Sequence, residues 1–205
     1  MPSSLKLIVG LGNPGPEYSE TRHNAGFWFL DRLAANAGAS FATDRKFHGE
    51  IARLKKNDTD CLLLKPMTFM NRSGRAVQAT AAYFNVEAEQ ILVVHDEIDL
   101  DAGIVRLKQG GGHGGHNGLR DIIEQTGGNG FLRLRIGVGH PGHSSQVHDY
   151  VLHRPDSGQQ RILDSAIESA LEIMPLVLDG QLNKAMTILH AVKKPTADTN
   201  EQEKK

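Results

Sequence analysis

The stretch Leu5-Lys-Leu-Ile-Val-Gly-Leu-Gly-Asn-Pro-Gly-Pro16 decides the fold class, because it joins a short apolar run to a loop rich in glycine and proline. Residues 5–11 predict a buried strand, and the Gly-Pro loop ends it. A helix is predicted next, over 21–37, where apolar residues repeat near a period of 3.6. A strand that leads into a helix is the unit from which α/β folds are built.

The rest of the chain continues this alternation. Predicted strands cover 50–55, 60–65, 90–95, 103–108 and 132–138, and predicted helices cover 73–84, 119–125, 157–178 and a shorter segment ending near Ala191. A turn at Asn57-Asp58 joins the first two of these strands as a hairpin, so the sheet is expected to be mixed. The predicted fold class is α/β, a single domain with a mixed twisted β-sheet flanked by helices on both faces. We expect this domain to cover 1–192 and a disordered tail to cover 193–205, which has almost no apolar side chains.

Composition excludes several classes of protein. The formal net charge is −1, so a polyanion site must be a local patch and not a property of the whole surface. No apolar run approaches the roughly 20 residues of a membrane-spanning helix. A single cysteine, Cys61, makes an intramolecular disulfide impossible and suits a reducing compartment. We therefore expect a cytoplasmic protein without membrane contact.

Polar residues gather on the connections that follow the predicted strands. In order along the chain, these residues are Asn13, His23, Asn71, Asp96 and Asn117. Sites in open α/β sheets lie beyond the carboxyl ends of parallel strands, so we expect these residues to share one rim if the strands are parallel.

His23 and Asp96 are the strongest candidates for chemistry. His23 lies at or just inside a predicted helix start, where the positive helix end favours a neutral imidazole, and a neutral imidazole can act as a general base. Asp96 is placed to accept a hydrogen bond from the other ring nitrogen and fix the tautomer. The plainer alternative is a surface histidine and a helix-capping aspartate. The chain has no G-x-S-x-G motif, and Cys61 lies in an apolar strand, so the pair points to direct attack by water.

The asparagines fit the same chemistry. Asn13, Asn71 and Asn117 are placed to hold a water molecule or to donate hydrogen bonds to an oxyanion. Their plainer interpretations are a turn residue, a helix-entry residue and a helix N-cap, respectively. The N-cap interpretation of Asn117 is compatible with a functional role.

Two further patterns indicate a ligand. Six glycines lie in the run Gly110–Gly118, just before a predicted helix, and close approach of a ligand explains them better than a flexible connector does. Arg106 and Lys108 point to one side of their strand, and Arg133 and Arg135 to one side of theirs. If the strands are neighbours, the four cations share a face that suits phosphate, with a solvated face paired to carboxylates as the alternative.

Two other patterns carry little weight. Gly10-Leu-Gly-Asn-Pro-Gly15 matches a dinucleotide fingerprint, but its prolines stiffen the turn, and Asp31 falls inside a helix where the fingerprint needs an acid after a second strand. The pairs His113/His116 and His140/His143 lack a carboxylate or thiol at a metal-ligand spacing. Neither a cofactor nor a metal is expected.

Six ordered motifs resemble those of one known family. They are Val9–Gly15, Tyr18 with 21–26, Lys65–Gly74, His95–Glu97, Gly110–Gly118 and Arg135–Gly142. Together they closely resemble bacterial peptidyl-tRNA hydrolases, and the resemblance extends to about Ala191.

This resemblance implies a monomeric, metal-independent esterase without a cofactor. Its partner is peptidyl-tRNA released prematurely from the ribosome, in which it cuts the bond between the peptide and the terminal ribose and so frees the tRNA. His23 is implied as catalytic base, Asp96 as its orienting partner and Asn13 as the reader of the blocked amino group. Substrate and tRNA contacts are implied for Tyr18, Phe69, Met70, Asn71, His116, Asn117, Lys108 and Arg135, the last two as a clamp on the 5′-phosphate of the tRNA.

Two other functions remain open from the sequence. A non-catalytic RNA-binding protein on the same fold is the main alternative, and the intact pair of His23 and Asp96 argues against it. A dinucleotide-dependent oxidoreductase is a more distant one. The sequence leaves open whether residues 139–156 form a lid.

Overall fold

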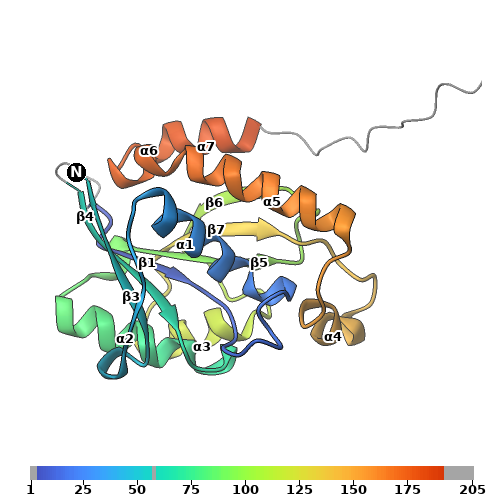
Figure 1. The fold of residues 1–205 in the computed structure, drawn as a ribbon, viewed down its shortest axis with the longest axis horizontal. Helices are drawn as coiled ribbons and strands as arrows, with labels where there is room; N and C mark the ends of the chain where they lie inside the picture. Colours follow the sequence, from blue (N-terminus) through green and yellow to red (C-terminus); the bar gives the residue numbers. More distant parts are fainter. Residues whose placement is uncertain (1–3, 57–58, 192–205) are drawn as a thin grey trace, which may run out of the picture.

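A computed structural model describes residues 4–56 and 59–191 of the chain. Its centre is a seven-stranded sheet in the order β2-β3-β4-β1-β5-β7-β6 (Figure 1). The strands are β1 (Leu7–Gly10), β2 (Ala42–Asp44), β3 (Gly49–Lys56), β4 (Thr59–Pro66), β5 (Ile91–Glu97), β6 (Val105–Gln109) and β7 (Leu132–Gly137). The four central strands β4, β1, β5 and β7 are parallel, whereas β2, β3 and β6 pair antiparallel at the edges. The mixed sheet is therefore confirmed, and both the turn at 57–58 and the expected tail at 193–205 lie outside the described residues.

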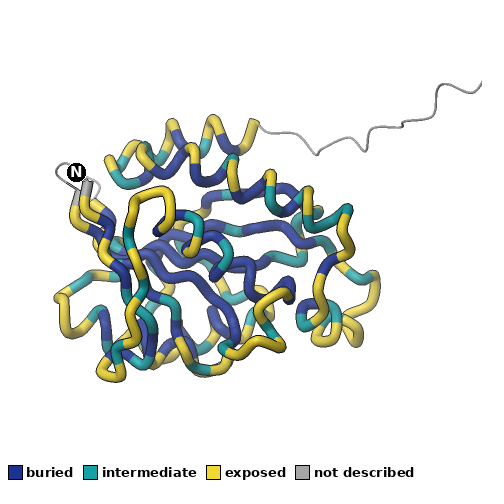
Figure 2. The backbone as a smooth tube through the Cα atoms, in the orientation of Figure 1, coloured by how far each residue is buried: buried dark blue, intermediate teal, exposed yellow. Residues whose placement is uncertain are grey.

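Helices cover both faces of the sheet, as expected. They are α1 (Ala25–Asn36), α2 (Ser73–Phe84), α3 (Asn117–Thr126), α4 (Val147–Val151), α5 (Ser157–Glu172), α6 (Met174–Leu178) and α7 (Leu182–Ala191), with 3₁₀ turns at Arg22–Asn24, Arg45–Phe47, Met70–Arg72, Ala88–Gln90 and Ser144–Gln146. Strand side chains alternate between two apolar clusters: Ile8 and Leu92 pack with α1, α5, α6 and α7, while Val9 and Val93 pack with α2 and α3. The central strands accordingly form the buried centre of the molecule, whereas the edge strand β2 is largely exposed (Figure 2). No described helix has the length and apolar character needed to cross a membrane.

Several element boundaries differ from the sequence-based expectation. The helix expected over 157–178 is two helices, because the chain turns at Ile173 and Pro175 lies in the first turn of α6, where a missing N–H is tolerated. The helix expected from residue 21 begins at Ala25, after a 3₁₀ turn that contains His23. Strand β2 was not expected, because three residues are too short to show a period.

The direction of β6 changes one part of the expected site. Gln109, the last residue of β6, pairs with Leu132, the first residue of β7, so β6 ends at the opposite end of the sheet from the carboxyl ends of the parallel strands. Asn117 does not reach the rim by following a parallel strand. Residues 110–116, which we call the glycine loop, carry the chain back to the rim where α3 begins.

Helix α1 packs against the sheet with no space between the two backbones. A Cβ atom added at Gly26 would clash with the backbone nitrogen of Leu11 and with the carbonyl oxygen of Val94. Both contacts are with main-chain atoms, which cannot rotate away as a flexible side chain can. Glycine is therefore required at this position for α1 to lie on β1 and β5.

Gly26→Ala is expected to destabilise the protein by about 3 kcal/mol, the upper end of ordinary overpacking costs. Its melting temperature should fall by roughly 2–4 °C for each kcal/mol in a chain of this size. Gly128→Ala is the matched control, because nothing lies within 4 Å of a Cβ there. Thermal unfolding followed by circular dichroism compares them, and equal melting of the two variants contradicts the close packing of α1.

Candidate active site

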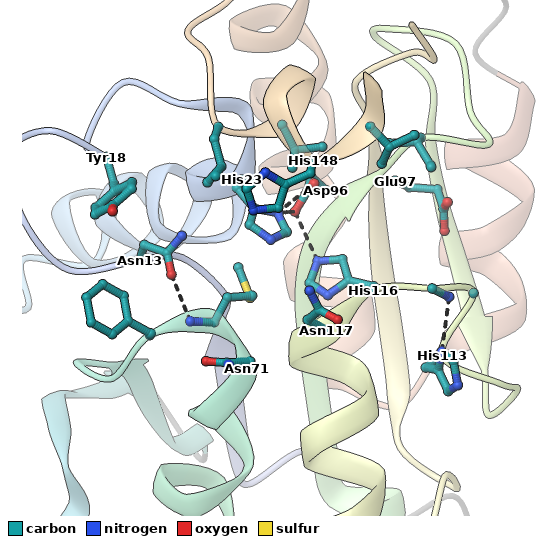
Figure 3. A pocket seen from close by; sticks show the side chains of 18 of the residues that line it. Asn13, Tyr18, His23, Asn71, Asp96, Glu97, His113, His116, Asn117 and His148 are labelled. Carbon is teal, nitrogen blue, oxygen red and sulfur yellow. Dashed lines mark hydrogen bonds and ion pairs between the residues drawn. The ribbon is translucent and has the colours of Figure 1, made fainter. Parts of the chain in front are cut away.

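A cavity of about 780 Å³ lies at the rim where β1, β4 and β5 end (Figure 3). Nine of the residues expected at the site line it: Asn13, Tyr18, His23, Phe69, Met70, Asn71, Asp96, His116 and Asn117. Val147 and Val151 of α4 line it as well. The region 139–156 therefore contributes a wall of this cavity, and the short helix in that wall was not expected from the sequence.

His23 and Asp96 form a buried pair in the floor of the cavity. The Nδ1 atom of His23 lies 2.9 Å from Oδ1 and 3.0 Å from Oδ2 of Asp96. Burial alone lowers the pKa of His23, but the charge and hydrogen bond of Asp96 outweigh it and raise that pKa above 6.5. The sequence predicted that the positive helix end favours a neutral His23, but the Asp96 carboxylate instead raises the pKa of His23. Because Asp96 contacts Nδ1, Nε2 remains the ring atom that can take up a proton.

Asp96 is shared by two histidines. Besides His23, the Nε2 atom of His116 lies 3.0 Å from Oδ1 of Asp96. Burial raises the pKa of Asp96, but the two histidines and their hydrogen bonds outweigh that effect and hold the pKa well below its usual range. Asp96 is therefore an ionised carboxylate that accepts from both rings.

His116 has a fixed tautomer. Its Nδ1 atom accepts hydrogen bonds from the backbone N–H groups of Gly118 (3.2 Å) and Leu119 (3.4 Å), so His116 is the N-cap of α3. With Nδ1 accepting, the proton of the neutral ring is on Nε2, which donates to Asp96. The expectation that Asn117 is the N-cap is wrong, because Asn117 is already the first residue of the helix.

The tautomer also bears on metal binding. The side-chain ligand atoms of His23, Asp96 and His116 lie within 4.8 Å of one another, as a metal site requires. A metal on Nε2 of a neutral His116 needs the ring proton on Nδ1, where it opposes the two backbone donors of α3. The geometry favours protons over a metal between these groups.

His95 contacts the backbone of Asp96. It is buried, and its Nδ1–H donates to the carbonyl oxygen of Asp96 at 2.7 Å. Burial, together with the electrostatic effect of His116 and Arg133, lowers the pKa of His95 to about 3, so the ring of His95 stays neutral. Its ring also packs edge-on against that of His116, with 5.0 Å between centroids.

Asn13 is held in place by its neighbour Asn24. The side-chain oxygen of Asn24 accepts from the backbone N–H of Asn13 (2.8 Å), and its amide nitrogen donates to the carbonyl of Asn13 (3.0 Å). The side-chain oxygen of Asn13 then accepts from the N–H of Met70 at 2.7 Å. The amide nitrogen of Asn13 points the other way, to the side where Tyr18 and His23 lie (Figure 3).

The side chains at the mouth of the cavity are more exposed to solvent than those in its floor. Phe69 is 58% exposed, and its ring meets that of Tyr18 edge to face with 6.3 Å between centroids. Asn71 and Asn117 are exposed, and the side-chain oxygen of Asn117 accepts from Arg120. These side chains line the cavity without being fixed in its floor.

The four cations of β6 and β7 share a face. Arg106 pairs in register with Arg135, and Lys108 with Arg133, which places all four on the side away from Leu107 and Leu134. Lys108 and Arg135 do not line the cavity. Lys108 is exposed, and Arg135 contacts Glu97 through a 2.9 Å ion pair. The shared face is confirmed, although Arg133 is buried within it.

Comparison with known proteins identifies the family. The family model described as peptidyl-tRNA hydrolase matches residues 7–198. A peptidyl-tRNA hydrolase from Neisseria meningitidis is 50% identical over 191 residues, which are 93% of this chain and 100% of that protein. The chain belongs to the peptidyl-tRNA hydrolase family. A family member from Pseudomonas fluorescens is 52% identical over 192 residues, covering 93% of this chain and 99% of that one.

Comparison with solved structures identifies the same family. A crystal structure of peptidyl-tRNA hydrolase from Acinetobacter baumannii has a TM-score of 0.90 and 49% sequence identity with this chain, covering 92% of it and 96% of the other. The resemblance that the six motifs indicated, and the fold that it implied, are confirmed.

This peptidyl-tRNA hydrolase uses residues that sequence reasoning missed. Arg22 is buried next to His23, donates to the carbonyl oxygens of Tyr150 (3.1 Å) and His153 (2.9 Å), and stacks on the ring of Tyr150. It thereby holds the end of α4 beside the pair of His23 and Asp96, as Asn24 holds Asn13. Both flank His23 in the motif 21–26, and that position was the one available indication of their roles.

Proposed function

We propose that His23 is the general base with which this peptidyl-tRNA hydrolase cuts the ester bond between peptide and tRNA. The observation that carries this mechanism is the buried contact between Nδ1 of His23 and the ionised carboxylate of Asp96, at the floor of the 780 Å³ cavity. Because Asp96 occupies Nδ1, the lone pair of the neutral ring is on Nε2. The pair therefore offers a base of fixed tautomer and direction.

In the proposed reaction, Nε2 of His23 takes a proton from a water molecule as its oxygen attacks the ester carbonyl carbon. The resulting imidazolium is stabilised by Asp96, and Asn71 and Asn117 hold the water and the substrate at the rim. When the tetrahedral intermediate collapses, the bond to the ribose oxygen breaks, and His23 returns the proton to that oxygen. The products are a free tRNA and the peptide acid, which releases its proton to solvent and becomes a carboxylate.

The remaining residues are assigned to recognition. The amide of Asn13 reads the blocked amino group, while Tyr18, Phe69 and Met70 contact the peptide. Lys108 and Arg135, on the cationic face beyond the cavity, bind the 5′-phosphate of the tRNA. We propose that the enzyme acts as a monomer on peptidyl-tRNA released prematurely from ribosomes.

Hydrolysis of an N-acetyl-aminoacyl-tRNA and of the matching unblocked aminoacyl-tRNA tests this function. We expect release of tRNA from the blocked substrate alone, because only that substrate presents an amide to Asn13. Acid precipitation of radiolabelled substrate measures the release. Equal cleavage of both substrates removes the role of Asn13 and keeps the esterase, whereas no cleavage of either contradicts the proposed reaction.

A further inference from the structure

Arg133 is a buried cation that lies against the start of the glycine loop. It is the second residue of β7 and is only 3% exposed. Its two terminal nitrogens, Nη1 and Nη2, donate to the carbonyl oxygens of Gly112 and Gly111. Its guanidinium lies 4.7 Å from the centre of the Phe131 ring, and among the described residues no hydrogen-bond partner reaches its Nε. The hydrogen-bonding capacity of this cation is thus directed at the backbone of the loop.

This arrangement separates Arg133 from the other cations on the face that β6 and β7 share. Its partner in register, Lys108, is exposed, and Arg135 is partly exposed beside it. A phosphate that reached Arg133 would have to displace two backbone carbonyl groups, which would then lose their donors. Arg133 is therefore poorly placed to bind tRNA, although sequence reasoning grouped it with a phosphate site.

The loop backbone is shaped to meet this side chain. Gly110 and Gly111 have φ angles of 64° and 105°, in the left-handed region that favours glycine. The planar fork of arginine reaches two neighbouring carbonyl oxygens at once, which the single ammonium group of lysine does not match. Two of the six glycines in the run thus have backbone conformations that favour glycine where the loop meets Arg133.

The other end of the glycine loop is attached to the catalytic pair. His113 accepts from the N–H of Gly115 at 3.0 Å, and His116 follows with its hydrogen bond to Asp96. The loop is thus held at its start by Arg133 and at its end by Asp96. Between these attachments it spans the sheet, from the end of β6 to the rim.

We propose that Arg133 is a positioning residue for the hydrolysis. By holding Gly111 and Gly112, it fixes the glycine loop that brings His116 to Asp96 and Asn117 to the cavity. Its loss therefore reduces turnover and leaves the affinity for tRNA intact. This inference rests on the proposed function, since the loop matters for turnover only if the pair of His23 and Asp96 performs the chemistry.

Kinetics of Arg133→Lys and Arg133→Met test the proposal on two substrates. One is N-acetyl-aminoacyl-tRNA, and the other is the N-acetyl-aminoacyl ester of adenosine, which lacks the tRNA body and its 5′-phosphate. We expect kcat to fall about 10- to 100-fold on both substrates, the loss typical of small displacements in a site, with KM for the tRNA substrate changed little. Lysine should not restore kcat, because it keeps the charge but not the fork. Arg161→Lys, an exposed arginine on α5, is the matched control.

Three outcomes overturn the proposal. A loss confined to the tRNA substrate, with full rescue by lysine, makes Arg133 a phosphate ligand. If kcat is unchanged in either folded variant, Arg133 takes no part in turnover. A lowered melting temperature with unchanged kcat makes it a residue for stability alone. No turnover by the wild type on either substrate is a failure of the proposed function and is recognised as such before any variant is compared.

A measurement on the wild-type protein serves if the variants do not fold. The side-chain NH resonances of Arg133 are followed by NMR as tRNA is added. We expect them to stay in place while those of Arg135 shift, because only Arg135 is open to the phosphate. A shift of the Arg133 resonances as large as that of Arg135 overturns the assignment, whatever the catalytic result.

Discussion

His23→Ala is expected to lower kcat by about 10²- to 10⁴-fold, the contribution typical of a positioned general base. The alanine removes the free imidazole lone pair, and the lone pair of His116 is already engaged by the N–H groups of Gly118 and Leu119, so water must attack without a base. Binding of tRNA should persist, because Lys108 and Arg135 lie outside the cavity. Single-turnover hydrolysis and fluorescence titration with tRNA separate the two effects.

The matched control is His143→Ala, which removes an exposed histidine outside the cavity. This control should hydrolyse the substrate at the wild-type rate. If His23→Ala retained wild-type kcat, that result would falsify the role of His23 as base. If the variant also lost tRNA binding, His23 would instead be a substrate contact.

The same base predicts how the rate depends on pH. His23 must be neutral to act, and its pKa is raised above 6.5 by Asp96 against the opposing effect of burial. As pH falls through that raised pKa, the imidazole takes up a proton, and kcat/KM should decline with an apparent pKa above 6.5. A rate profile that is flat between about pH 5 and about pH 8 contradicts this assignment.

Asp96→Asn is expected to have an effect of similar size, about 10⁴-fold on kcat, as found for the matching change in serine proteases. Oδ2 of Asp96 lies 3.0 Å from Nδ1 of His23, whereas Oδ1 also accepts a hydrogen bond from Nε2 of His116. An amide nitrogen in the place of Oδ2 donates to Nδ1 and favours the tautomer with the proton on Nε2. The base then has no lone pair to offer the water.

The pH profile distinguishes this explanation from general damage. Without the negative charge of Asp96, burial alone acts on His23 and lowers its pKa, so the acidic limb of the residual activity should move to lower pH. Asp60→Asn, at an exposed ion pair with Arg53, is the control and should change neither kcat nor the profile. An acidic limb that stays in place in Asp96→Asn argues that another group titrates.

The parts of the fold that could be predicted from the sequence are those that depend on interactions over a few residues. The apolar period of α2 and the glycine and proline loop after β1 act over a few residues, so both were expected nearly where they occur. The helix break at Ile173 was missed, because apolar spacing continues across it and outweighed the local signal of Pro175 in the first turn of α6.

The candidate site likewise has one part that short motifs predict and another that depends on contacts between distant residues. His23 and Asp96 stand next to element ends, and short motifs around them are specific enough to indicate both the pair and the family. The contact of His116 with Asp96 and the contacts of Arg133 with the glycine loop join residues 20 or more positions apart, which no short motif indicates.

The sequence by itself determined the α/β class, the family, the candidate pair of His23 and Asp96 and the absence of a nucleophile motif, because each depends on residue type and short-range order. Tertiary structure alone decided that β6 runs antiparallel, that the glycine loop must therefore return along the sheet, and that Arg133 is enclosed beneath it. The physical reason is that strand direction and the partners of buried charges are set by pairing between distant segments. A buried arginine and an exposed one have the same side chain, and only their surroundings determine whether the charge meets a backbone carbonyl or a phosphate.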